Sequence, residues 1–287
     1  MAFIRLSVFF VVFFTACSQA NSGDKPQRQT NTGLGKKNNN SSDQLPPANG
    51  GGSQTTESAV HPKILFHGGG GYSALTPGIK DMSSASQQIA KLGFPSKDIF
   101  LVTYPDTKNI SDIKAALDPQ LKKIFAKYDA NTRFDAIGHS LGLLAGFVSL
   151  SELGHLPKIR SIIGVNGVLM RQETSAMPAG CSPNNTRDLC GDIFDKVVGS
   201  SNSPYIVGLI QQNQTELTRI NKCAIWSSND GILKPANSGV FPVGKSVEMT
   251  GNWCKNASLF NPCHLQAKSS PEVFAKMKSD CFNGNWD

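Results

Sequence analysis

The chain has 287 residues, of which 39% are hydrophobic and 17% are charged. This balance is typical of a globular protein, because it is too apolar for a wholly disordered chain and too polar for a protein with many membrane spans. Lysine and arginine (28) exceed the acidic residues (21), for a net charge of +7, but no basic run is longer than a pair such as Lys36–Lys37. Nucleic-acid binding normally shows a stripe of basic side chains, so we expect no nucleic-acid partner.

Residues 1–16 resemble a signal peptide. One basic residue precedes a largely apolar run, 6–14, that is too short to span a bilayer. The small residues before Cys17 resemble a bacterial lipobox, which implies that Cys17 is diacylated and becomes the first residue of the mature protein. The alternative is an ordinary secretory signal cut near Ala16 or Ala20. Either interpretation predicts that the protein is exported.

Residues 17–61 differ sharply in composition from the rest of the chain. They are mainly Asn, Ser, Gly, Gln, Thr, Pro and Lys, and their larger apolar residues are Leu34, Leu45 and Val60. Such a segment cannot bury enough apolar surface to offset the entropy cost of ordering, so we expect a disordered tether. Behind an acylated cysteine it would keep the folded domain at a membrane. Ser18 stands where aspartate acts as an inner-membrane retention signal, so the resemblance implies the outer membrane, on its periplasmic or surface face; without the lipid, the protein would be secreted.

Six cysteines remain after Cys17, and an even number in an exported chain suggests disulfides. The sequence alone does not determine how six cysteines are connected. Cys181 and Cys190 are separated by the same short distance in the sequence as Cys254 and Cys263, which favours two local pairs. Cys223 and Cys281 remain as the third expected pair. No Cys-x-x-Cys pair occurs, so we expect no zinc site.

Residues 62–287 alternate apolar, strand-like runs with helix-compatible segments. Strands are expected at 63–66, 99–103, 134–137, 159–165, 223–227 and, more weakly, 247–249. Helices are expected at 83–92, 109–128, 141–153 and 271–277. Strands that alternate with helices of this length predict a mainly parallel sheet flanked by helices, in one α/β domain.

The segment Gly138–Gly142, with the sequence Gly-His-Ser-Leu-Gly, connects an apolar strand to an apolar helix. This arrangement is typical of a nucleophile elbow, a strained turn that exposes a serine hydroxyl at the carboxyl edge of a sheet. On this segment the chain resembles the α/β-hydrolase superfamily, in particular its lipases and esterases. The resemblance implies that Ser140 is the nucleophile; the alternative is a glycine-rich packing turn.

A second glycine-rich turn, His67–Gly71, follows the first expected strand. Lipases of the superfamily have a similar turn here, and one of its backbone N–H groups forms half of the oxyanion hole. The resemblance assigns this N–H to Gly69, with Gly70 as the alternative, and the other N–H to Leu141. We expect His67 to position the turn rather than to carry a proton.

The catalytic residues of the superfamily occur in the order serine, acid, histidine. His264 is the histidine that lies after Ser140 near the carboxyl terminus, so the resemblance implies that it is the general base, and we expect it in a loop rich in Asn, Ser and Pro. Asp230 follows an expected strand in an Asn-Asp-Gly turn that resembles the superfamily's acid motif, which implies that it orients the base. Its rivals are Asp192, Asp195 and Glu248.

Residues 168–221 are an insertion at the point where this superfamily places a lid, and we expect a small cap there. The resemblance spans residues 62–287. It implies a serine carboxylic-ester hydrolase that forms an acyl-enzyme, acts on an ester or lipid substrate, needs no metal or organic cofactor and is a monomer. Two alternatives remain open. One is a deacylase or thioesterase that acts on acylated protein or cell-envelope glycan, and the other is a tethered binding module without catalytic activity.

Overall fold

The structure, a computed structural model, describes residues 60–69, 82–105, 110–169, 204–233, 236–255, 257 and 262–286. The described residues all belong to one compact unit, Thr55–Asp287. The expected signal peptide, nearly all of the tether, Cys17, the pair Cys181–Cys190 and much of the expected cap lie outside the described residues. His61, which the sequence places in the tether, hydrogen-bonds through Nδ1 to the Arg133 carbonyl at 3.0 Å.

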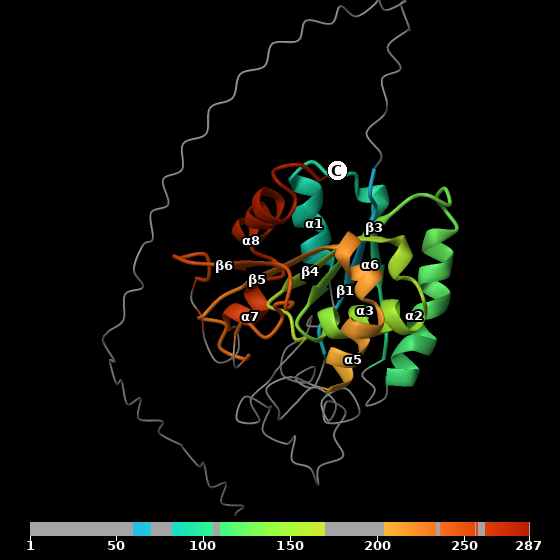
Figure 1. Cartoon of the computed structure of the whole chain (residues 1–287). Helices are drawn as coiled ribbons and strands as arrows, with labels where there is room; N and C mark the ends of the chain where they lie inside the picture. Colours follow the sequence, from blue (N-terminus) through green and yellow to red (C-terminus); the bar gives the residue numbers. More distant parts are fainter. Residues whose placement is uncertain are drawn as a thin grey trace, which may run out of the picture. The chain divides into compact units, whose positions relative to one another are not determined.

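Strands of the described part form one six-stranded parallel sheet in the order β2-β1-β3-β4-β5-β6 (Figure 1). They are β1 (Lys63–Phe66), β2 (Ile99–Val102), β3 (Phe134–His139), β4 (Ile159–Val165), β5 (Asn221–Trp226) and β6 (Lys245–Glu248). Every strand expected from the sequence is present, and β1 and β4 have the expected bounds. The prediction of a parallel sheet is therefore confirmed.

Helices cover both faces of this sheet, with α1 and α8 together on one side in Figure 1 and α2 and α3 on the other. The α-helices are α1 (Ser83–Lys91), α2 (Ile110–Phe125), α3 (Leu141–Glu152), α5 (Pro204–Gln212), α6 (Gln214–Arg219), α7 (Cys263–Gln266) and α8 (Pro271–Lys276). Short 3₁₀ turns, η1 (Ser96–Asp98) and η2 (Leu156–Lys158), precede β2 and β4, and a π-helical turn, η4 (Met277–Cys281), continues α8. The sequence did not predict α5, α6 or α7; α5 and α6 lie in the region of the expected cap.

Neighbouring residues of a strand pack into different cores. Leu65 of β1 belongs to a cluster with Ile89 of α1 and Phe274 of α8. The next residue, Phe66, belongs to a second cluster with Phe147 of α3. Both faces of β1 are therefore buried, which is why its residues 64–66 are all apolar.

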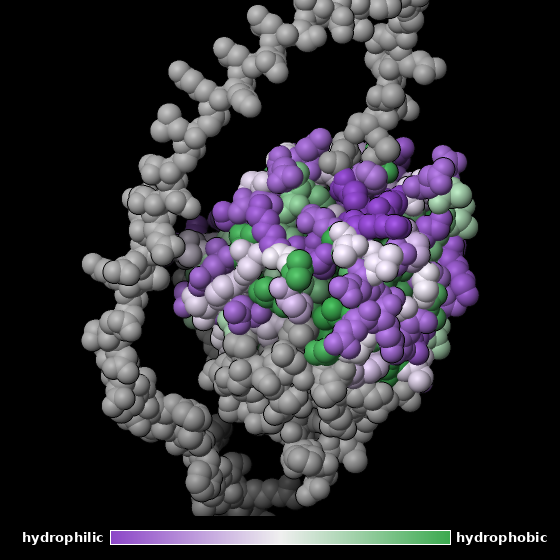
Figure 2. Space-filling model, in the orientation of Figure 1, coloured by the Kyte–Doolittle hydropathy of each residue, from purple (hydrophilic) through white to green (hydrophobic). Residues whose placement is uncertain are grey.

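The face of the molecule in Figure 2 is mainly hydrophilic where it is coloured. Among the described residues, the large hydrophobic side chains that are exposed are Val60, Leu101 and Val243. Within this described part, no helix has the length and apolar character that crossing a membrane requires.

A buried cluster of charges lies at the amino edge of the sheet. Lys63 of β1 and Asp135 of β3 are both fully buried, with Nζ 2.6 Å from Oδ2. Arg160 of β4 donates to both carboxylate oxygens of Asp135, at 2.9 and 2.8 Å. Lys63 and Arg160 each also donate to the carbonyl of Trp286, at 2.8 Å. The cluster therefore attaches the carboxyl-terminal segment to three strands of the sheet.

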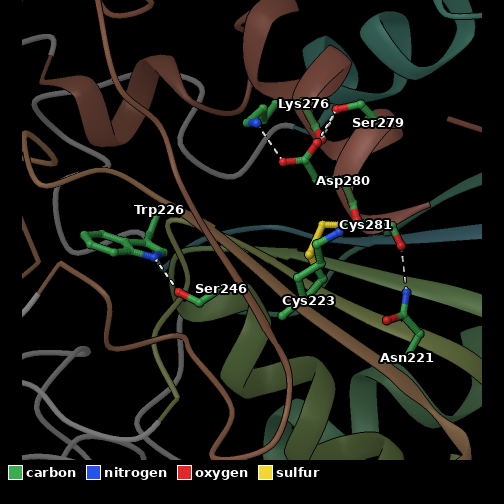
Figure 3. The surroundings of a disulfide bond; sticks show 9 residues. Asn221, Cys223, Trp226, Ser246, Lys276, Ser279, Asp280 and Cys281 are labelled. Carbon is green, nitrogen blue, oxygen red and sulfur yellow. Dashed lines mark hydrogen bonds and ion pairs between the residues drawn. A yellow bond between two sulfur atoms is a disulfide. The ribbon is translucent and has the colours of Figure 1, made fainter. Parts of the chain in front are cut away.

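The disulfide between Cys223 and Cys281 attaches the same segment covalently, because it joins β5 to η4 (Figure 3). This pair is one of those expected from the sequence. Beside it, the side-chain amide of Asn221 donates to the carbonyl of Cys281 at 2.8 Å. The two cysteines are 58 residues apart in the sequence. In the chain-entropy model, a cross-link over a loop of this length stabilises a fold by about 4 kcal/mol.

Asp135→Asn should lower the free energy of unfolding by about 3–5 kcal/mol, because it removes the buried carboxylate that pairs with both Lys63 and Arg160. Urea denaturation of the disulfide-bonded protein measures this loss. The control is Lys122→Ala, which removes an ion pair with Asp118 in which the lysine is 66% exposed and which therefore contributes little. An Asp135→Asn variant as stable as the control would contradict the prediction.

Candidate active site

Ser140 lies in a tight turn between β3 and α3, as the elbow prediction requires. Its φ of 55° and ψ of −127° are strained for a residue other than glycine. A Cβ on Gly138 would lie 2.4 Å from the nitrogen of Leu143, and one on Gly142 would lie 2.2 Å from the carbonyl oxygen of Phe66. Glycine at both positions therefore allows strand and helix to meet at the turn.

The end of β4 holds this turn in place. The Ser140 N–H donates to the carbonyl of Val165 at 3.2 Å, and the Ser140 carbonyl accepts from the N–H of Val168 at 3.0 Å. Both peptide groups of the strained residue are therefore fixed by the neighbouring strand and the residues that follow it. The serine side chain is left at the carboxyl edge of the sheet, next to the amino end of α3.

The His67–Gly68 turn packs directly against Ser140. A Cβ on Gly68 would lie 3.1 Å from the Ser140 Cβ, a contact so tight that a side chain there would require its neighbours to shift. Gly69, the predicted oxyanion donor, comes next and is partly exposed, whereas Gly70 lies outside the described residues. Leu141, the other predicted donor, is the first residue of α3. The structure thus brings the two predicted oxyanion segments to the same serine.

His67 and Tyr104 hold the shape of this turn. His67 donates from Nδ1 to the Gly68 carbonyl at 2.8 Å and accepts at Nε2 from the N–H of Tyr104 at 3.2 Å. The two rings stack with their centroids 4.0 Å apart, and the Tyr104 hydroxyl donates to the His67 carbonyl. His67 therefore has the structural contacts that the sequence predicts. The sequence analysis did not identify Tyr104. The one feature of the sequence that could have indicated its role is its position just after β2, the strand that pairs with β1.

Asp230 and His264 form a buried pair. The Asp230 Oδ2 lies 2.8 Å from the His264 Nδ1, and the two residues are 0% and 2% exposed. The other carboxylate oxygen accepts from the backbone N–H groups of Ile232 and Leu233, at 3.0 and 2.6 Å. These bonds fix the carboxylate in the turn after β5, where it can orient the imidazole and stabilise its protonated form.

His264 is the second residue of the short helix α7, so the expectation that it lies in a loop is wrong. The reason is local: Pro262 precedes the helix, and its carbonyl accepts from the N–H of Leu265 at 3.0 Å. The His264 N–H donates to the Asp230 carbonyl at 2.8 Å. The residue before it, Cys263, is bonded to Cys254, as the sequence predicts. Main-chain and covalent links thus position the imidazole.

The hydrogen bonds of the described residues include none between the Ser140 hydroxyl and His264. In serine hydrolases this bond is often long or poorly aligned until the substrate binds. The ring of His139, the residue before the serine, lies with its centroid 4.9 Å from that of His264. The base therefore lies against the residue that precedes the nucleophile, at the edge of the sheet.

Of the rival acids, only Glu248 lies among the described residues, and the Asp230 carboxylate, not Glu248, bonds to His264. Glu248 is an exposed residue of β6, and Asp192 and Asp195 lie outside the described residues. A cavity of about 520 Å³ lies beside the Asp230 turn, between Asn229 and Gly231 on one side and Cys254 on the other. Ser140 does not line it, so we assign it no part in binding the reacting ester. Among the described residues, no group of His, Cys, Asp or Glu side chains is arranged to hold a metal ion.

Removing the Cys254–Cys263 disulfide should lower kcat more than it lowers stability. A cross-link over so short a loop stabilises the fold by roughly 2–3 kcal/mol, but it also holds the residue before His264, and a shift of about 1 Å can slow a reaction on the order of 100-fold. The measurement compares kcat of the double variant Cys254→Ser/Cys263→Ser with wild type at a temperature where both are folded. An unchanged kcat would show that the disulfide does not position the histidine.

No protein-family model matches the sequence, and no curated protein has significant sequence similarity to it. Solved structures do resemble the fold. The propeptide form of the Bacillus licheniformis lipase BlEst2 has a TM-score of 0.52 at 16% identity, over 79% of this chain and 51% of that one. The mature form has a TM-score of 0.50 at 13% identity, over 79% of this chain and 94% of that one. Identities this low establish the fold alone: it is the α/β-hydrolase fold, as predicted.

Proposed function

We propose that the protein is a serine carboxylic-ester hydrolase of the lipase and esterase type, with Ser140, His264 and Asp230 as its catalytic triad. The observation that carries the proposal is the convergence of a strained serine and a buried His–Asp pair at one edge of the sheet. A strained main chain persists only where the surroundings enforce it, and such strain occurs at functional sites. The two BlEst2 structures, described as a lipase, agree with this assignment but do not carry it.

In the proposed mechanism, the Ser140 Oγ attacks the ester carbonyl while the Nε2 of His264 accepts the hydroxyl proton. The Nδ1 proton stays on the histidine and is held by the Asp230 carboxylate, 2.8 Å away. The carbonyl oxygen becomes an oxyanion, which the N–H groups of Leu141 and Gly69 stabilise. The amino end of α3 adds the positive end of its dipole at the same place.

The tetrahedral intermediate then breaks down. His264 donates its Nε2 proton to the leaving alkoxide, so that the alcohol departs and the acyl group remains on Ser140. Water next attacks the acyl-enzyme while His264 accepts a proton from it. Collapse of the second intermediate releases the carboxylic acid and returns the proton to Ser140. Each proton moves between the substrate, water or Ser140 and one imidazole nitrogen.

Ser140→Ala should lower kcat on the order of 10⁶-fold, because it removes the attacking atom. Asp230→Asn should lower it on the order of 10⁴-fold, because the amide no longer holds the imidazole in the required tautomer. We would measure kcat on p-nitrophenyl esters from acetyl to palmitoyl. An acyl thioester and an acylated peptide serve as further substrates. Glu248→Gln, an exposed carboxylate changed in the same way, serves as the control and should retain kcat.

A wild-type protein that hydrolyses none of these substrates would favour the binding-module alternative. Near-native activity of Ser140→Ala on a substrate that the wild type cleaves would contradict the triad. Faster turnover of the thioester or the acylated peptide than of every simple ester would identify the protein as a deacylase that uses the same site.

The amino-terminal sequence supports the further proposal that Cys17 carries a lipid anchor in the outer membrane. A single acyl chain binds membranes only marginally, so two chains on one cysteine suit stable anchoring. Cys17→Ser should therefore move the protein from the membrane fraction to the soluble fraction of fractionated cells. An unmodified amino terminus beyond residue 17 in the wild type, found by mass spectrometry, would contradict the anchor.

A further inference from the structure

We infer that His139 is a positioning residue, whose Nε2–H hydrogen bond to the His264 carbonyl fixes the general base relative to Ser140. This inference rests on the proposed function, because it assigns a role within the same site. Its basis is a buried contact that joins two distant segments. The Nε2 of His139 lies 2.8 Å from the carbonyl oxygen of His264, across 125 residues of sequence.

The hydrogen bond completes a set that holds His264 from three directions. The N–H of His264 donates to the Asp230 carbonyl at 2.8 Å, and its Nδ1 is 2.8 Å from the Asp230 carboxylate. Both of these bonds run to one residue in the turn after β5. Among the hydrogen bonds of the described residues, the bond from His139 is therefore the one that ties the base to the segment of the nucleophile.

His139 is well suited to transmit position because it adjoins Ser140 and is itself rigid. It is the last residue of β3, is fully buried and pairs with Val165 of β4. The Val165 carbonyl also accepts the N–H of Ser140. The nucleophile and the donor to the base are thus anchored to the same point of the sheet, so a shift of α7 relative to Ser140 would break the hydrogen bond.

The other side of the His139 ring faces the predicted oxyanion turn. A Cβ on Gly68 would lie 3.2 Å from the Nδ1 of His139 and 3.1 Å from the Ser140 Cβ. This Nδ1 is buried and has no hydrogen-bond partner among the described residues. The proton of the neutral ring therefore belongs on Nε2, where it is donated to His264. The ring fills the space between the turn, the serine and the base.

The ring also has to remain a neutral donor while His264 gains and loses a proton. Burial, and then the neighbouring charge on protonated His264, hold the pKa of His139 well below its usual value. A second proton on His139 would have no acceptor at Nδ1 and would oppose the charge that forms on His264 in each step. The positioning bond therefore persists through the catalytic cycle.

The test compares variants that differ in their ability to reach the His264 carbonyl. The amide nitrogen of His139→Gln reaches the place of Nε2, whereas that of His139→Asn reaches only the place of Nδ1. His139→Leu fills much of the space without a donor. His155→Leu, which removes a histidine that bonds to Asp118 outside the site, is the matched control. The concentration of active sites is determined by titration with a fluorophosphonate. The value of kcat is then calculated per active site, so that misfolded protein does not lower it.

We expect His139→Asn and His139→Leu to lower kcat on the order of 10- to 100-fold, the effect of a base misplaced by about 1 Å. The KM should change by less than about twofold, because substrate binding does not use this bond. His139→Gln should keep kcat within about threefold of wild type, and His155→Leu should leave kcat and KM unchanged. If the leucine variant does not fold, the glutamine and asparagine variants, both polar amides, decide the question.

A second measurement does not depend on turnover. The proton on His264 Nδ1, bonded to a carboxylate, gives a strongly downfield signal in the proton NMR spectrum. We expect the signal in wild type and His139→Gln and its loss or broadening in His139→Asn. Wild-type kcat together with an unchanged signal in His139→Asn would overturn the inference, as would an equal loss of kcat in the glutamine and asparagine variants. An inactive wild type or an active Ser140→Ala variant would instead contradict the proposed function, and the NMR signal would still decide whether His139 holds His264.

Discussion

The main-chain conformation of Ser140 is the constraint on which the rest of the site depends. A positive φ costs a residue of this kind on the order of 1–3 kcal/mol, so it persists only where neighbours impose it. Here the end of β4 and the residues that follow it bind the peptide groups on both sides of the serine, and Gly138 and Gly142 let strand and helix close on the turn. This arrangement ends β3, begins α3 and presents the side chain at the edge where the other candidate site residues gather.

The two halves of the site are anchored in different ways. Ser140 directly follows β3, a central strand whose pairing with both neighbours leaves little freedom. His264 belongs to α7, a helix of four residues that does not directly follow a strand of the sheet. A long connection separates it from β6. Its position comes from the Asp230 turn, the Cys254–Cys263 bond and the ring of His139. This difference explains why so many separate contacts converge on so short a helix.

Local signals in the sequence were enough for the sheet and the elbow, whereas the candidate triad came from the resemblance to a superfamily. Residues 64–66 of β1 form a continuous apolar run, Ser140 lies between two glycines, and the spacing of Cys254 and Cys263 suits a local loop. What the sequence did not reveal depends on tertiary contacts. Tyr104 is paired with a histidine 37 residues away and His139 with one 125 residues away, and neither contact leaves a periodic pattern. α7 is too short to show helical periodicity, so its histidine was expected in a loop.

The central claim, that Ser140 is a nucleophile activated by His264, is tested most directly by covalent labelling. The folded, full-length protein is treated with a fluorophosphonate, digested and mapped by mass spectrometry, beside a His264→Ala variant treated in the same way. The account predicts one adduct, on the peptide that contains Ser140, and much slower labelling of that peptide in the variant. An adduct on another residue, or labelling of Ser140 that is as fast without His264 as with it, would contradict the account.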